Sequence, residues 1–474
     1  MIRRTFYLMA AQVFGRATGF LLLIIMGNVL GASSMGAYGT MTTMLMLATI
    51  ISTFGIDLWL ARHVANEQIS SKDFWRINLM KWALTVFALA LYFMAFQVGW
   101  LSDELSPHRW SVLLVLGSLF FDHIALTAQS ILEGRRELPA IAKCIVMRWS
   151  VFAAAGICTL IIDPSLFMFC ASFFLASAAR AIYSIALVKS QLSQHSQPKV
   201  LRELLLEAAP MALLNTMVGL YFHIDMLMIP ALDSMDGAGF YKVAYTMVEA
   251  LLFISGAVAA SLFPVFSKKE IAFGEKWEHF SRGSYLLLLC AFPISLCTPF
   301  VSSWIIELFF IDAARALEFL PSASALNILV WALPAMFINS SLVRLFLGMH
   351  WQKSALIGVS ITACVNIILN LALIPRIGFV GAAYSTVASE VTLASFLCMK
   401  LMLDRRPIGI WTPILKPLLA SLITYPLALW ASSMGQLWII PVTILGYAVF
   451  LWLTKLVTVD DFRRFGVIEN GSGQ

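Results

Sequence analysis

The sequence predicts an all-α polytopic membrane protein of about 14 transmembrane helices. Of its 474 residues, 60% are hydrophobic and only 12% are charged, whereas a soluble domain has roughly 45–50% apolar and about 25% charged residues. Apolar stretches of about 18–26 residues recur along the chain, and one membrane-crossing helix needs about 20 such residues. No stretch alternates as a membrane β-strand would. A soluble protein is therefore excluded.

The expected spans are separated by short polar or Gly/Pro-containing connections. They lie at roughly 7–30, 37–61, 79–100, 111–132, 144–162, 166–188, 208–230, 238–265, 284–308, 322–346, 355–374, 380–401, 414–432 and 437–456. The first six spans form a predicted lobe at residues 1–190 and the next six a second lobe at 191–401, while 402–474 holds two added spans and a cytoplasmic tail. The first span has no small-residue cleavage site after it, so we expect it to be retained.

Basic residues predict the orientation of the bundle. Of the 32 Lys and Arg residues, 25 fall in connections on the N-terminal side, Lys81 and Arg148 among them, and three fall on the opposite side. Because positive charge accumulates in cytoplasmic loops, both termini are expected in the cytoplasm. Contacts with anionic lipid headgroups account for the net charge of +6 without a nucleic-acid partner. Asp57, near the end of the second span, is interpreted as interfacial in the same way.

An internal repeat favours two lobes. Residues 35–52 align without gaps to residues 238–255, and six of the 18 positions are identical, including Gly36 and Gly239. The offset of 203 residues corresponds to six spans and preserves their orientation. Parallel repeats of this kind place a central site between the lobes of many carriers.

Ionisable residues within the spans are the candidate functional residues, because a charge at mid-bilayer costs about 2.5–3.5 kcal/mol on insertion scales. Arg16 lies about nine residues into the first span, and Thr5, Gln12 and Gly19 share its helical stripe. We interpret Arg16 as a cation that lines a wet cavity, with an arginine bonded to neighbouring carbonyls as the alternative. Arg180 either lines the cavity or extends to the cytoplasmic surface.

Asp225 and Lys242 form the best candidate ion pair. The seventh and eighth spans turn near residue 233, eight residues after Asp225 and nine before Lys242, so the two lie at equal depth. The pair is either a structural salt bridge or a pair that switches partners during transport. His223 and Glu249 on the same hairpin extend it in the second interpretation.

Amide and carboxylate side chains form a second candidate site. Asn366 and Asn370 share a helix face, and Glu390 lies at similar depth in the next span. With Asp225 they can supply oxygen ligands for a small cation, or a titrating carboxylate, but interhelical amide bonds are the favoured interpretation. The sequence contains no GxxxxGK[ST] motif, and its seven cysteines occur singly, so neither a nucleotide, another cofactor nor a structural metal is expected.

Four segments carry a family resemblance over essentially the whole chain. They read VFGRATGFLLLIIMGNVLGASSMGAYG, TFGIDLWLARHVA, HIDMLMIPALDSMDGAGFYKVAYTMVEAL and IPRIGFVGAAYSTVASE. In order and spacing the chain resembles polysaccharide exporters, specifically flippases of O-antigen and related lipid-linked oligosaccharides. Their superfamily also contains multidrug and toxin extrusion transporters and lipid II flippases.

The resemblance implies a two-lobed bundle with a central cavity and alternating access. The implied substrate is a polyprenyl-pyrophosphate-linked glycan, moved outward across the bacterial inner membrane by a proton, sodium or potential gradient. Arg16 resembles a cavity arginine on the first span of lipid II flippases, and Asp225, Asn366 and Asn370 resemble sodium-binding positions in some of them. Implied partners are membrane lipids, a polymerase and a chain-length regulator of lipopolysaccharide biosynthesis.

The residues agree with such a substrate, because a pyrophosphate needs fixed cations in a low-dielectric cavity. Arg16, Lys242 and Arg180 are the candidates, with Gln12 as a polar neighbour. A cation-coupled multidrug exporter of the same superfamily is the first alternative. A membrane glycan polymerase or glycosyltransferase is the second, but external connections of about 3–11 residues leave little room for a catalytic domain, so no enzyme is expected.

Overall fold

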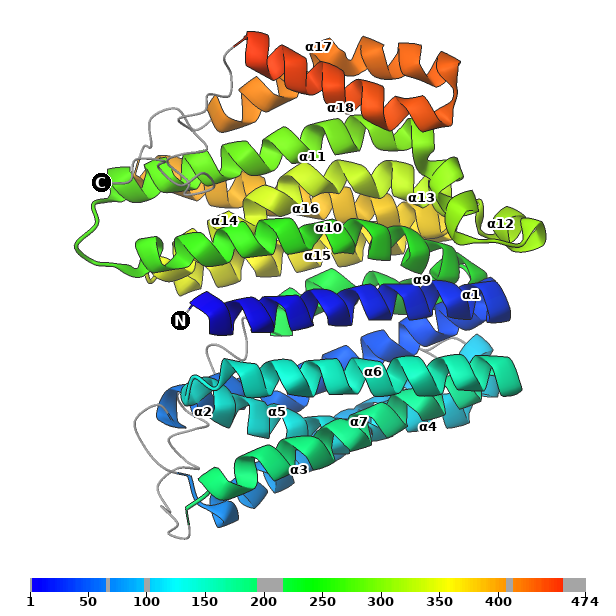
Figure 1. Cartoon of the computed structure of the whole chain (residues 1–474), viewed down its shortest axis with the longest axis vertical. Helices are drawn as coiled ribbons and strands as arrows, with labels where there is room; N and C mark the ends of the chain where they lie inside the picture. The colour runs from blue at the N-terminus through cyan, green and yellow to red at the C-terminus, as the bar shows by residue number, and fades with distance from the viewer. Residues whose placement is uncertain (1, 65–68, 98–102, 194–215, 406–411, 455–474) are drawn as a thin grey trace. The chain divides into compact units, whose positions relative to one another are not determined.

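The computed structural model describes residues 2–64, 69–97, 103–193, 216–405 and 412–454, and these are almost entirely helical (Figure 1). The earlier elements are α1 (Ile2–Thr53), α2 (Ile56–Val64), α3 (Ser71–Gln97), η1 (Asp103–His108), α4 (Arg109–Gly117), α5 (Leu119–Gly134), α6 (Leu138–Ile162), α7 (Leu166–Val188) and η2 (Lys189–Gln191). The later elements are α9 (Asp225–Leu232), α10 (Met235–Ser267), α11 (Phe273–Phe309), α12 (Ala313–Phe319), α13 (Ser322–Leu329), η3 (Val330–Ala332), α14 (Leu333–Gly348), α15 (Gln352–Ile377), α16 (Phe379–Arg405), α17 (Thr412–Met434) and α18 (Gln436–Leu453). The predicted all-α class is confirmed.

Eleven helices among the described residues are long and apolar enough to cross a membrane, as expected for a multi-pass protein. The first, Phe6–Thr53, is 48 residues long and contains the first predicted span and most of the second. The last predicted span corresponds to a shorter apolar helix, Trp438–Leu453. Part of the seventh, residues 208–215, lies outside the described residues. The count of fourteen and the side of the termini stay predictions.

Two breaks shape the N-terminal helices. Gly31 interrupts α1 with a φ of 84°, a left-handed conformation that glycine adopts at little cost because it lacks a Cβ. After Thr53, Phe54 and Gly55 also have positive φ values, and α2 begins at Ile56. The first break turns the chain between the first two predicted spans. The second gives α2 its own direction, with Asp57 in its first turn.

The chain packs into two compact units. Unit 1 contains Met1–Thr246, Phe309–Pro321 and Val359–Ser385; unit 2 contains Met247–Leu308, Ser322–Gly358 and Thr386–Gln474. Unit 1 therefore includes α12 and most of α15, which lie far along the chain from α1. The predicted lobes at 1–190 and 191–401, with the added spans at 402–474, stay predictions.

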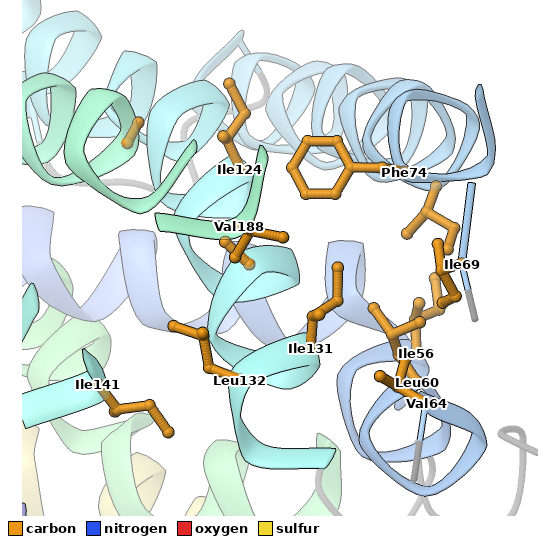
Figure 2. Packing of buried hydrophobic residues seen from close by; sticks show 13 residues of the cluster. Ile56, Leu60, Val64, Ile69, Phe74, Ile124, Ile131, Leu132, Ile141 and Val188 are labelled. Carbon is orange, nitrogen blue, oxygen red and sulfur yellow. The ribbon is translucent and has the colours of Figure 1, made fainter. Parts of the chain in front are cut away.

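A buried apolar cluster joins five helices of unit 1, namely α2, α3, α5, α6 and α7 (Figure 2). Ile56 and Leu60 of α2 pack with Phe74 of α3, Ile131 of α5 and Val188 of α7. Because lipid tails are as apolar as these side chains, close van der Waals packing stabilises such contacts within a membrane. The cluster fixes the rotation of α2, α3 and α5, whose other faces carry buried polar side chains.

In unit 2, α17 and α18 lie side by side as a helical hairpin (Figure 1). Gly435 between them has a φ of 115°, which favours glycine. Val301 of α11, Ala431 of α17 and Ile439 of α18 form a buried cluster that holds the hairpin against α11.

Candidate functional site

Asp225 is the centre of a buried polar network in unit 1. It begins α9 and is 2% exposed. The Tyr241 hydroxyl, on α10, donates a hydrogen bond of 2.7 Å to Oδ2 of Asp225. The Asn370 amide, on α15, donates one of 2.6 Å to Oδ1. Two separate helices thus place donors on both oxygens of one carboxylate.

Asn366 completes this network one turn earlier on α15. The Asn370 Nδ2 also donates a hydrogen bond of 3.0 Å to Oδ1 of Asn366, and both asparagines are fully buried. Oδ1 of Asn370 has no hydrogen-bond partner among the described residues. The structure therefore brings together three of the four residues of the predicted oxygen site. Such oxygens suit a hard cation, although no group of three or more Asp, Glu, His or Cys residues with metal-binding geometry occurs in the described part of the chain.

Glu390, the fourth residue, belongs to unit 2 and has a different partner. It is 1% exposed in α16. The Asn339 Nδ2, from α14, donates hydrogen bonds of 2.7 Å to the Glu390 carboxylate and 2.9 Å to its carbonyl oxygen. Glu390 and Asn339 form a second buried carboxylate–amide pair. Glu249, also in unit 2, is half-buried in α10.

Lys242 is half-buried, and the ion pairs of the described residues do not join it to Asp225. The hydroxyl of its neighbour Tyr241 occupies the carboxylate instead. The Lys242 methylenes lie close to Gly39 of α1, where a Cβ would come within 3.2 Å. His223 is half-buried in the helical segment before α9.

Arg16 and Gln12 are exposed on the first half of α1. Gly19 of the same predicted stripe lies against the indole of Trp149 on α6, where a Cβ would come within 2.8 Å. The side chain of Thr5 lies outside the described residues. The stripe therefore divides into a packed glycine and exposed polar residues.

Two arginines share one buried aspartate on α5, α6 and α7. Asp122 is 6% exposed, and its two oxygens lie 3.5 Å from Nη2 of Arg148 and 3.5 Å from Nη1 of Arg180. Arg180 also donates to Gln129 at 2.9 Å, and its buried Nε has no hydrogen-bond partner among the described residues. With two cations and one anion, this cluster carries one net positive charge inside the bundle.

The arginine cluster corrects two sequence interpretations. Arg180 is 7% exposed and paired, so the interpretation that it extends to the cytoplasmic surface is wrong. Arg148, assigned from the sequence to a cytoplasmic connection, lies on α6 beside Asp122. A usable signal was present, because Arg148 and Arg180 are each 16 residues from Pro164 at the turn between their spans and so share one depth.

A third network fixes Lys81, which is fully buried. Its Nζ donates to Asp57 of α2 and, at 2.9 Å, to Oγ1 of Thr127 on α5. The Thr127 hydroxyl lies 3.1 Å from Oδ1 of Asn78, one turn before Lys81 on α3. The interpretation of Lys81 as a surface cation is therefore wrong, whereas the interfacial position of Asp57, whose side chain is 25% exposed, stays a prediction. Positive charge in a short loop region predicts the side of the membrane but not the face of the helix.

Replacing Lys81 by methionine is expected to destabilise the protein by about 1–3 kcal/mol, because Asp57 and Thr127 lose a charged partner. Thermal unfolding in detergent measures the loss. The double variant Lys81→Met/Asp57→Asn should recover part of it, since no charge is then left unpaired. A double variant as unstable as the sum of the single variants would contradict coupling between the two side chains.

An apolar cavity of about 410 Å³ lies elsewhere in unit 1. Leu47 and Ile50 of α1, Leu91 of α3 and Leu227 of α9 are among the described residues that line it. None of the predicted site residues is among them. Its lining suits hydrocarbon and not a charged headgroup.

The sequence and the fold of the chain are similar to those of known membrane proteins. A family model described as "polysaccharide biosynthesis protein" matches residues 1–270. An uncharacterized membrane protein of Methanocaldococcus jannaschii is 21% identical over 420 residues, which cover 80% of this chain and 79% of the relative.

Solved structures show the same fold. The lipid II flippase MurJ in an inward closed conformation is similar over 97% of this chain and 100% of its own, with a TM-score of 0.74 and 17% identity. An inward-facing multidrug resistance MATE family transporter of the MOP superfamily is similar over 82% of this chain and 94% of its own, with a TM-score of 0.64 and 13% identity. At these identities the likeness establishes a shared fold.

Proposed function

Because the chain belongs to the polysaccharide biosynthesis protein family, we propose that it is a flippase for polyprenyl-pyrophosphate-linked oligosaccharides. The glycan is an O-antigen unit or a related surface polysaccharide, moved from the cytoplasmic to the periplasmic leaflet of the bacterial inner membrane. The MurJ and MATE folds support transport by alternating access. A polymerase and a chain-length regulator would then receive the unit outside.

The observation that carries the proposal is the excess positive charge at Asp122. One aspartate cannot neutralise both Arg148 and Arg180, and Nε of Arg180 has no hydrogen-bond partner in the part of the chain that the structure describes. Guanidinium groups bind phosphate oxygens by paired, charge-assisted hydrogen bonds, which strengthen where water is excluded. The cluster therefore favours an anionic headgroup over the cationic substrate of a multidrug exporter. Arg16 and Lys242 are the other proposed contacts, with Gln12 beside them.

The buried carboxylates are the proposed coupling residues. Asp225 with Asn366 and Asn370 offers oxygen atoms to sodium, or Asp225 offers a carboxylate to a proton. Glu390 and Glu249 are further candidates for proton coupling. No ATP is required, because an ion gradient supplies the free energy.

Reconstitution tests the proposed substrate. Purified protein in vesicles should expose a fluorescent polyprenyl-pyrophosphate oligosaccharide to a quencher on the far side. The same protein should not move a cationic dye across the vesicle membrane. Vesicles that move the dye and not the glycan would identify a multidrug exporter instead. Vesicles that move neither, with or without an ion gradient, would contradict the flippase.

A further inference from the structure

The break in α1 at Gly31 leaves backbone groups without helical partners. The first four N–H groups and the last four C=O groups of a helix have no hydrogen-bond partner within that helix. Here the carbonyls of Asn28 and Val29 end the first segment, and the amide of Ala32 begins the second. Their partners come from α12, about 285 residues along the chain.

Arg315 and Glu318 of α12 bind both sides of this break. The Arg315 guanidinium donates to the Asn28 and Val29 carbonyls, at 3.1 Å each. The Glu318 carboxylate accepts from the Ala32 amide at 2.7 Å and from Arg315 at 2.6 Å. A cation thus meets helix carbonyls and an anion meets a helix amide, which is the favourable polarity for both.

The Asn28 side chain adds two bonds to the same contact. Its Nδ2 donates to the Phe309 carbonyl at 3.0 Å, and its Oδ1 accepts from the Ile311 amide at 3.0 Å. The connection that joins α11 to α13 is therefore tied to the turn in α1 by side-chain and backbone groups. All of these residues belong to unit 1.

Other connections of unit 1 are tied in the same way. The amide of Met235, the first residue of α10, donates a hydrogen bond of 2.6 Å to Glu104 of η1. The amide of Phe379, the first residue of α16, donates one of 2.9 Å to Asp233. We name the set of 28–32, Glu104, 233–235, 309–319 and Phe379 the collar. By the bias of basic residues, every one of these connections is on the external side of the membrane.

Next to the collar, the backbones of α1 and α10 pack closely against each other. A Cβ on Gly36 of α1 would lie 2.9 Å from the Gly239 amide nitrogen of α10, and a Cβ on Gly239 would clash with the Ala32 carbonyl, at 2.9 Å from its carbon atom. Thr40, one turn beyond Gly36, is 1% exposed and donates to the Met226 carbonyl at 3.3 Å. The two glycines are the paired positions of the internal repeat, so equivalent helices of the two sequence halves meet here.

We propose that the collar is the external gate of the transporter and that Arg315 and Glu318 are its latch. The inference rests on the proposed function, because a flippase must open outward to release its substrate. The collar joins the first sequence half, at 28–32 and Glu104, to the second half at the other three positions. Outward opening separates the halves at this end and so breaks the bonds that join 28–32 to 309–318 and Glu104 to Met235. Arg315 and Glu318 are 31% and 33% exposed, so water can replace their bonds when the gate opens.

Cysteine labelling tests the gate. In full-length protein whose seven native cysteines are replaced by alanine, Thr40→Cys reports whether the buried contact between α1 and α9 has opened. Arg315→Gln/Glu318→Gln should increase its rate of modification by an external, membrane-impermeant maleimide about tenfold, if each lost bond weakens the closed state modestly. The matched control is Arg282→Gln/Glu278→Gln, which removes another intrahelical ion pair. An unchanged rate, or an equal increase in the control, would overturn the gate.

A second measurement tests the gate if the latch variant Arg315→Gln/Glu318→Gln folds poorly. Val29→Cys/Arg315→Cys, bridged by a short bis-methanethiosulfonate reagent that forms a disulfide with each thiol and releases methanesulfinate, should stop glycan movement, and a reductant that cleaves both disulfides should restore it. Movement that continues in the bridged protein would overturn the gate. Labelling of Thr40→Cys needs no substrate, so faster labelling in a protein that moves no glycan would contradict the proposed function and leave the gate standing.

Discussion

Arg180→Gln is expected to slow glycan movement by roughly ten- to hundredfold. A hydrogen bond to a charged group contributes roughly 1.5–3 kcal/mol, and about 1.4 kcal/mol corresponds to a factor of ten. The variant removes the unused Nε donor and one of the two cations at Asp122. The rate of glycan exposure in reconstituted vesicles measures the effect.

Two further variants separate an anion-binding role from a structural role. Arg282→Gln is the matched control, because Arg282 pairs along its own helix with Glu278 as its one ion-pair partner among the described residues, and its rate should stay near the wild-type value. Asp122→Asn removes the anion that competes with the substrate, so binding of the pyrophosphate headgroup should become tighter. If Asp122→Asn instead unfolds the protein and Arg180→Gln stays within twofold of wild type, the cluster only stabilises the fold.

Asp225→Asn is expected to reduce gradient-driven movement to the rate observed without a gradient. The amide keeps the size of the side chain and its oxygen for the Tyr241 hydroxyl, but it loses the charge that attracts a cation or proton. Rates are measured with a sodium gradient, a proton gradient and neither. The gradient that loses its effect identifies the coupling ion.

Asp404→Asn is the control for the gradient response of Asp225→Asn, since Asp404 pairs with Lys400 at an exposed end of α16. It should respond to both gradients as the wild type does. Asn370→Ala should lower the response to sodium more than the response to protons, because the amide oxygen binds only the metal ion. If Asp225→Asn still responds fully to both gradients, the Asp225 network does not couple transport.

The Asp225 network shows what equal depth can and cannot predict. Counting from the turn near residue 233 correctly places Asp225 level with residues 241 and 242. It does not choose between them, and successive helical residues point about 100° apart. The packing of α10 turns Tyr241 toward the carboxylate. Lys242 therefore faces another direction, although its depth is the predicted one.

The wrong positions predicted for Lys81 and Arg148 have one cause. Positive charge near a span end predicted cytoplasmic loops for Lys81 and Arg148. Lys81 instead reaches Asp57 because the apolar cluster around Ile56 and Phe74 fixes α2 against α3. The break at Phe54 and Gly55, which directs α2, leaves no periodic signal in composition.

Amino-acid composition and helical period were enough to establish a multi-pass helical protein and to identify Asp225, Asn366 and Asn370 as buried oxygen groups. Those properties are local: twenty apolar residues exclude water, and four residues make one helical turn. The partners of each charge depended on the packed structure. Asn370 binds a carboxylate 145 residues away, and Glu318 binds an amide 286 residues away. Contacts at such separations follow from how whole helices rotate and pack, because a side chain bonds to whichever group that packing brings within about 3 Å.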